Sequence, residues 1–391
     1  MTALALPDTP TDRRVAIVDL AGRLAAIAAA NAPAHDQNNT FPHDTFAALR
    51  ASGYLALTVP AEFGGGGATP LELMLAQEQL AGGDGSAGLA SAMHLMHVGG
   101  LADSRAWPPE LLHRFFADVV QRGATVNGLA SEPDLGSPSR GGQYATTARA
   151  VADGWLVNGR KIWSTLSPDL SWYTVLLTLV EPNGEMRRGS VLIPVGTPGV
   201  RIVETWDNLG MRATGSHDVV FEDVFVPDDH RLPDATGRPR VDGRGWTLAT
   251  SAVYLGIATA ARDFAVDYAR TRIPSGVGRP IAELQTVQHR IAQIEVLLLQ
   301  ARSVLYGCAE GWATDPEQGE DWGWRFAAAK YTVTNHAIQV TDLALRVVGS
   351  AGLQRQHPLE RYFRDVRAGL GNPPMDDVAL TLIGKAALGL E

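Results

Sequence analysis

The segment from Thr125 to Pro227 decides the fold. It contains Leu129-Ala-Ser-Glu-Pro-Asp-Leu-Gly-Ser137 and Gly159-Arg-Lys-Ile-Trp-Ser-Thr165, within runs where β-branched and aromatic residues alternate with polar ones. The pairs Asp153-Gly154, Asn158-Gly159 and Asn183-Gly184 separate such runs, and these dipeptides favour hairpin turns. An antiparallel sheet or small barrel is therefore predicted. Its expected strands are Ala145–Val151, Trp155–Val157, Trp172–Val180, Ser190–Val195 and His217–Val226.

Helical patterns flank this segment on both sides. The expected helices are Ala16–Ala30, Asp44–Ser52, Pro70–Ala81, Ala87–Leu101, one through Gly245–Ala261, one carrying an apolar stripe from Leu284 to Leu305, Trp324–Val348 and Asp376–Leu388. The fold class predicted is α+β. A flexible N-terminus (1–10) precedes an N-terminal helical domain (11–122), a middle antiparallel β-barrel domain (123–232) and a C-terminal four-helix bundle domain (233–391).

Composition excludes several classes of protein. The chain has 391 residues, 33 Lys and Arg against 42 Asp and Glu, and a formal net charge of −9. An acidic chain with no basic stripe argues against nucleic-acid binding. Its one cysteine, Cys308, cannot form an internal disulfide, so a cytoplasmic location is expected. No targeting segment is expected. No membrane span is expected either, because the uncharged stretch 245–261 is too short to cross a bilayer.

Familiar cofactor and metal motifs are absent from the sequence. It has no Gly-x-Gly-x-x-Gly fingerprint, no phosphate loop, no nucleophile elbow and no Cys/His cluster of metal-binding spacing. No metal site is therefore expected. If the protein is an enzyme, an organic cofactor held without a dinucleotide fingerprint is the natural candidate.

The two quoted motifs resemble the paired flavin-binding signatures of the acyl-CoA dehydrogenase superfamily. The resemblance runs in order from about residue 50 to 367. Its further landmarks are Val59–Gly65, Glu78–Ala81, Leu209–Ser216, Phe221–Pro227, Gly278–Gln285 and Pro358–Asp365. The order and spacing of these motifs are specific, although each alone is not. The chain is thereby identified as a divergent flavoprotein of this superfamily.

The resemblance implies roles for the residues of the two signatures. FAD is the expected cofactor, with FMN possible. The backbone at Leu129 and the Ser131 hydroxyl would lie along the edge of the flavin ring, and Trp163 would stack on one face with Thr165 hydrogen-bonding nearby. Ser137 would lie towards the pyrophosphate or the substrate. Glu132 is interpreted as a structural turn carboxylate.

A neighbouring subunit would complete the cofactor site. The resemblance assigns Arg272, Gln285 and the turn from Arg346 to Gly352, which includes Gly349, to the adenosine half of FAD across an interface. This implies a homodimer or homotetramer. Two positions depart from the family. Pro274 stands where the family carries an arginine, and Arg346 stands where a glutamine is typical.

The usual catalytic base is missing. Dehydrogenation of an acyl thioester requires a base beside the α-carbon, and Pro373 occupies the position where the family places a glutamate, next to Asn372. Some relatives carry the glutamate on the first bundle helix instead, near Trp246, where this chain also has none. Asp242 and Asp376 are the nearest candidate carboxylates, and a capping role for Asp376 is an equal alternative. The Asp-x-x-Arg pair that contacts CoA in the family is also absent, so CoA binding stays open.

Three functions therefore remain. The first is an acyl-CoA-dehydrogenase-type oxidoreductase that oxidises a CH–CH unit of an acyl thioester and passes electrons to an electron-transfer flavoprotein. The second is a two-component flavin monooxygenase that takes reduced flavin from a reductase and acts on a small aromatic or heterocyclic substrate. For it, Ser131, His94 and His97 are candidate donors, although the two histidines are equally well explained as ordinary helix residues. The third is an inactive flavin-fold subunit that serves assembly.

Overall fold

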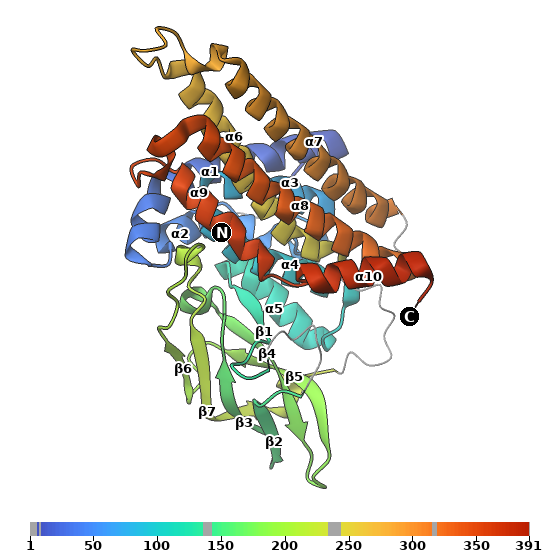
Figure 1. The fold of residues 1–391 in the computed structure, drawn as a ribbon. Coiled ribbons are helices and arrows are strands. Elements are labelled where there is room, and N and C mark those ends of the chain that lie inside the picture. The colour runs from blue at the N-terminus through green and yellow to red at the C-terminus, as the bar shows by residue number, and fades with distance from the viewer. Residues whose placement is uncertain (1–5, 8, 136–142, 234–243, 315–318, 391) are drawn as a thin grey trace.

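The computed structural model describes residues 6–7, 9–135, 143–233, 244–314 and 319–390. Helices occupy both ends of the chain and strands the middle. The N-terminal helices are α1 Pro10–Asn38, α2 His43–Ala51, α3 Pro70–Gly83, α4 Gly85–Ser104 and α5 Pro109–Arg122. The C-terminal helices are α6 Ala249–Thr271, α7 Gln285–Thr314, α8 Gly319–Val348, α9 Leu359–Asp365 and α10 Asp376–Leu388. In Figure 1 the strands form one end of the molecule and the helices the other.

Local chemistry accounts for the helix starts. Thr69 and Glu72 form a capping box at α3, in which the Thr69 hydroxyl accepts from the Glu72 amide and the Glu72 carboxylate accepts from the Thr69 amide. At the start of α1 the Thr9 hydroxyl accepts from the Asp12 amide without the reciprocal bond of a capping box. Pro10 and Pro70 stand at the first helical positions of α1 and α3. Among the described residues, α1 is the one helix long and apolar enough to cross a membrane by length and composition. It packs along α3, with Ile17 and Leu24 buried.

The strands form one mixed sheet. They are β1 Val126–Leu129, β2 Thr147–Val151, β3 Gly154–Lys161, β4 Trp172–Val180, β5 Met186–Pro194, β6 Val200–Val203, β7 Asp218–Pro227 and β8 Arg231–Leu232. Their order is β6-β7-β3-β2-β4-β5-β8, with β1 joined to β4. The expectation of an antiparallel barrel needs correction, because β1 and β2 both pair parallel to β4. Such pairings join strands that are not consecutive, and hairpin signals do not reveal them.

One of the three predicted hairpin turns does not form. Asp153-Gly154 joins β2 to β3 and Asn183-Gly184 joins β4 to β5, as predicted. Asn158-Gly159 instead lies inside β3, where the pairing with β7 shifts between Val157 and Gly159. Gly159 has φ 149°, and a Cβ there would lie 2.5 Å from the Thr146 hydroxyl. The glycine therefore permits a bulge and a close strand approach, not a turn.

The helices above the sheet form a continuous core. The α6 helix, apolar along its first half, packs against α3 and α4 on one side and α7 and α8 on the other. The predicted stripe of α7 is buried at Val287, Ile294, Leu298, Ala301 and Leu305. The α10 helix packs against α8 (Figure 1). The α4 helix contacts both α6 and β1, so its side chains lie between the bundle and the sheet.

Candidate functional site

The two signature segments meet at the end of β1. Leu129 closes β1 in a buried position, paired with Val175 of β4. Two residues further on, the Ser131 carbonyl accepts a hydrogen bond of 3.0 Å from the Ile162 amide. Ser131 therefore lies beside the segment that carries Trp163 and Thr165, which follows β3 directly. Ser137 and Asp242 fall outside the described residues.

Trp163 presents an open aromatic face. It has φ 58°, which a bulky residue rarely adopts, and its side chain is 58% exposed. The edge of its ring contacts Trp206 at a centroid distance of 5.8 Å. Close by, the Thr165 hydroxyl contacts the Ser216 hydroxyl at 2.8 Å, and the Asn127 amide donates to the Thr165 carbonyl at 3.0 Å. A flat apolar surface beside fixed hydroxyls fits an isoalloxazine ring, which is apolar on its faces and polar along its edge.

A buried ion pair joins the two signature segments, between Glu132 of the first and Lys161 of the second. The Glu132 carboxylate accepts hydrogen bonds from Lys161 Nζ at 2.7 Å and from the amides of Ala145 and Thr146 at 2.6 and 2.9 Å. Burial raises the pKa of Glu132, but these bonds outweigh it and the pKa is lowered. Burial lowers the pKa of Lys161 to about 8. Lys161 also lies over the Tyr144 ring. Glu132 thus holds the turn before β2, and its contacts agree with the structural role predicted for it.

His94 is a structural residue of α4. It is fully buried, its Nε2 donates to the Leu55 carbonyl at 2.9 Å, and its Nδ1 accepts from the Val126 amide at 3.1 Å. Because a carbonyl only accepts and an amide only donates, these partners define one neutral tautomer. Burial lowers the His94 pKa to about 4. The prediction of a free donor at His94 is therefore wrong: this side chain ties α4 to the start of β1.

His97 makes fewer hydrogen bonds than His94. It is partly buried, its Nε2 lies 3.3 Å from the Thr174 hydroxyl, and its other nitrogen faces Gly128 of β1. A Cβ at Gly128 would lie 3.7 Å from His97 Nδ1. Burial lowers the His97 pKa to about 4, so the ring is neutral at pH 7. His97 is the histidine that lies over the flavin-signature strand.

The segment where the family carries its base holds no free carboxylate near position 373. The Asn372 amide donates to the Tyr254 hydroxyl at 2.6 Å. Asp376, the first residue of α10, accepts from the Asn335 amide at 3.0 Å and lies 3.6 Å from Lys330 Nζ. The N-cap of α10 is Met375, so the capping role considered for Asp376 is wrong. Asp376 instead joins α10 to α8.

Tyr254 is the residue that the sequence analysis missed. It is 1% exposed, on the face of α6 that meets Asn372, and burial raises its pKa. The sequence feature that could have revealed it is that Tyr254 is the one tyrosine in the apolar stretch 245–261. A buried tyrosine hydroxyl needs a hydrogen-bond partner.

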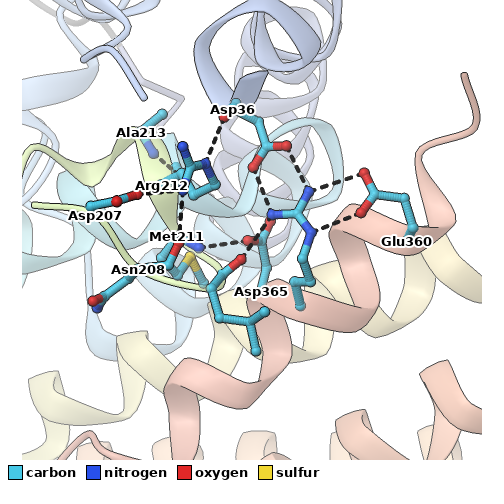
Figure 2. Close-up of polar contacts among 11 residues, drawn as sticks. Asp36, Asp207, Asn208, Met211, Arg212, Ala213, Glu360 and Asp365 are labelled. Atoms are coloured by element: carbon cyan, nitrogen blue, oxygen red, sulfur yellow. Dashed lines mark hydrogen bonds and ion pairs between the residues drawn. The ribbon is translucent and has the colours of Figure 1, made fainter. Parts of the chain in front are cut away.

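A junction of three regions, shown in Figure 2, lies a few residues before Asn372 in the chain. Arg364 at the end of α9 donates to Asp36 of α1 at 2.9 and 2.6 Å and to the Leu209 carbonyl at 2.9 Å. The next residue, Asp365, accepts from the Met211 amide at 2.6 Å, and burial raises its pKa to about 7. The two residues link α9 to both the N-terminal helices and the β region.

The remaining candidates lie on the bundle surface. Arg272 ends α6, Gln285 begins α7, and Arg346 and Gly349 lie at the end of α8; all four are exposed. A hydrogen bond of 3.0 Å from Arg290 to the Arg346 carbonyl holds the start of α7 to the end of α8. No cluster of three or more metal-ligating side chains occurs among the described residues.

The architecture is that of an acyl-CoA dehydrogenase flavoprotein. It consists of a helical domain, a β region in which Trp163 is exposed, and a long helical bundle. Family models for the acyl-CoA dehydrogenase N-terminal, middle and C-terminal domains match residues 11–103, 128–224 and 247–372. The putative acyl-CoA dehydrogenase YdbM of Bacillus subtilis is 41% identical over 92% of this chain and 93% of its own length. The chain therefore belongs to the acyl-CoA dehydrogenase family.

Other relatives carry different names. The amino sugar nitrososynthase DnmZ of Streptomyces peucetius is 31% identical over 94% of this chain and 90% of its own length. The structure of KijD3 in complex with FMN and dTDP-3-amino-2,3,6-trideoxy-4-keto-3-methyl-D-glucose superposes with a TM-score of 0.86. It shares 29% identity and covers 100% of this chain and 97% of that one. Family membership therefore defines the fold and a flavin-dependent class of oxidoreductase, and leaves the reaction open.

Proposed function

We propose that the chain is a flavin-dependent monooxygenase that receives reduced flavin from a partner reductase. The observation that carries the proposal is the absence of an available base in the segment from Asn372 to Asp376. Pro373 has no ionisable group, Asn372 is bonded to Tyr254, and Asp376 is bonded to Asn335 beside Lys330. Monooxygenation does not require removal of an α-proton from a thioester, so these residues present no obstacle to it.

The cofactor would be held by Ser131, Trp163 and Thr165, with the backbone at Leu129 along the ring edge. FAD and FMN both fit this part of the site, because it would contact only the ring that they share. Reduced flavin would supply the electrons and activate oxygen, with one oxygen atom going to the substrate and the other to water. Trp163 would cover one face of the ring. His97, neutral at pH 7, would offer one N–H donor beside β1.

The relatives support a substrate class to test first. KijD3 was solved with FMN and a dTDP-linked amino sugar, and DnmZ is named as an amino sugar nitrososynthase. Nucleotide-linked amino sugars are therefore the first compounds to test, followed by small aromatic and heterocyclic amines. In each case the oxidised atom would be a nitrogen or carbon presented to the flavin beside His97.

An acyl-CoA dehydrogenase coupled to an electron-transfer flavoprotein is the second candidate. Its support is the 41% identity to YdbM, which is named as a putative acyl-CoA dehydrogenase. This reaction would need Asp376 to leave Asn335 and Lys330 and serve as the base. The third candidate, an assembly subunit without a cofactor, predicts that the purified protein has no affinity for FMN or FAD.

The assembly proposed is a homodimer or homotetramer. Arg272, Gln285, Arg346 and Gly349 are exposed and available to a cofactor of a second copy. A cavity of about 570 Å³ between α7 and α8 ends at Arg346, and Val296 on its rim is 54% exposed. Burial of such apolar side chains against a second copy would stabilise the assembly. Analytical ultracentrifugation with and without FAD measures the oligomeric state.

The deciding experiment compares two reactions of the flavin-loaded protein. In the first, acyl-CoA thioesters of several chain lengths are added without oxygen. In the second, the protein is reduced and mixed with oxygen and a candidate amine. We expect no thioester to bleach the flavin and the amine to yield an oxygenated product. His97→Gln should release more hydrogen peroxide per product, whereas His43→Gln, at an exposed position, should not. Thioester bleaching that Asp376→Asn abolishes would establish the dehydrogenase instead.

A further inference from the structure

A second pocket lies away from the flavin-signature residues. It has a volume of about 500 Å³ and lies between α5, the start of β4 and the end of β5. Arg114, Gln121 and Arg122 line it from α5, and Trp172 and His230 line it from the β region. A packed series of rings from Trp172 through Phe115 and Trp107 to His97 lies between it and the flavin strand. Pockets of this size accommodate small organic ligands.

Arg114 is held in place without an acidic partner. Its Nη2 donates to His230 Nε2 at 2.6 Å, and its guanidinium carbon lies 5.8 Å from the centre of the Trp172 ring. His230 Nδ1 lies 3.0 Å from the Leu192 carbonyl, which only accepts, so Nδ1 carries the ring proton. Nε2 is then the acceptor for Arg114. His230 therefore offers Arg114 a hydrogen bond but no negative charge, and the charge of Arg114 is left uncompensated.

The carboxylate that lines the pocket is already engaged. Asp118 accepts from the Trp172 indole nitrogen at 2.9 Å and forms an ion pair with Arg122. In the described part of the chain, Arg114 contacts no carboxylate, and the Gln121 side chain has no hydrogen-bond partner. The pocket therefore carries a net charge of about +1 on a protein whose formal net charge is −9.

We propose that this pocket binds a small organic anion through a carboxylate or phosphate group. The free N–H groups of Arg114 would take the anionic head in a forked arrangement, which suits the planar guanidinium. The Gln121 amide would add a donor. The apolar part of the ligand would lie against Ala117 and Pro194, which complete the lining. The site is independent of the reaction proposed above, since none of its residues is a flavin or catalytic candidate.

Isothermal titration of the full chain in low-salt buffer tests the proposal, with sodium benzoate and inorganic phosphate as separate probes. We expect at least one of them to bind saturably with one site per chain. Arg114→Gln should weaken that binding by about 10-fold or more, because a charge-assisted hydrogen bond is lost. Ala117→Phe, which fills the pocket and leaves Arg114 intact, should also weaken it. Arg149→Gln, at an exposed arginine on β2, should leave it unchanged.

The outcomes separate cleanly. Benzoate binding alone assigns a carboxylate with an apolar body, and phosphate binding alone assigns a phosphate head. No saturable binding of either probe overturns the proposal. An equal loss in Arg114→Gln and Arg149→Gln also overturns it, because the binding would then be unspecific attraction to surface charge. Because Arg114 is exposed, we expect Arg114→Gln to leave the melting temperature unchanged. An unchanged melting temperature in each variant shows that weaker binding does not come from a folding defect.

Discussion

Arg364 and Asp36 form a forked pair across 328 residues of chain. The two guanidinium nitrogens donate to the two carboxylate oxygens at 2.9 and 2.6 Å, and both side chains are largely buried. Glu360 accepts from the same guanidinium at 2.7 and 3.0 Å. Because Asp365 bonds to Met211 one residue later, this pair locks α9 to the helices and the β region at one point.

Arg364→Gln should therefore lower the free energy of unfolding by about 2–4 kcal/mol, since it leaves Asp36 and Glu360 without their cation in a partly buried place. Arg262→Gln is the matched control, because Arg262 pairs with the exposed Asp263 and Glu295 and should cost about 0–1 kcal/mol. Urea unfolding measures both. An equal loss of unfolding free energy in the two variants would contradict the proposal that the Arg364 junction stabilises the fold more than a surface ion pair does.

Acid should weaken the fold through His94. Its pKa falls from an ordinary 6.5 to about 4 in the folded chain, because burial disfavours the cation. Below pH 6.5 the unfolded chain therefore binds a proton that the folded chain refuses. The contribution of His94 to stability is complete above pH 6.5 and is lost as the pH falls towards 4. The loss amounts to about 3 kcal/mol at most.

His94→Gln removes this pH dependence. The variant should be less stable than the wild type at pH 7.5, by about 1–3 kcal/mol, because the glutamine cannot reproduce both backbone hydrogen bonds. The difference should shrink at pH 4.5. The exposed His43→Gln serves as the control and should parallel the wild type at both pH values. A constant difference between His94→Gln and the wild type would contradict the proposed cause.

The ion pair of Glu132 and Lys161 should behave as a unit. Glu132→Gln leaves a cation that is fully buried in the fold, and we expect a cost of about 3–5 kcal/mol. Lys161→Met combined with Glu132→Gln should recover much of that cost, because no unpaired charge remains. A double-mutant cycle by urea unfolding tests this. Additive single costs would mean that the two groups are not coupled.

Trp163 should contribute to flavin affinity without supporting the fold. Its ring is more than half exposed, so Trp163→Ala removes little packing. We expect flavin binding to weaken by about 10-fold or more, as loss of a stacked aromatic contact implies. Quenching of flavin fluorescence during titration gives the dissociation constant. Replacing the buried Trp155 of the preceding strand β3 by phenylalanine should instead lower the melting temperature. Unaltered flavin affinity in Trp163→Ala would remove this residue from the site.

The sequence predicted local features well and long-range ones poorly. The bounds of β4 and α10 were predicted as observed, because each follows from a short pattern of its own residues. The role of His94 was not predictable, since its partners Leu55 and Val126 lie 39 and 32 residues away. The partner of Asn372 was missed for the same reason. Backbone groups that are distant in sequence define those environments, and no side-chain pattern encodes them.

The junction at Arg364 and Asp365 also limits how the three matched domains can be recombined. A chimera that takes its bundle from a relative inherits that relative's α9, whose guanidinium and carboxylate must find Asp36 and the Met211 amide in the recipient. Without those partners, the grafted helix would bring unsatisfied charges into the interior. Exchange of parts between members of the family should therefore succeed when Asp36 and residues 209–211 are transferred together with α9.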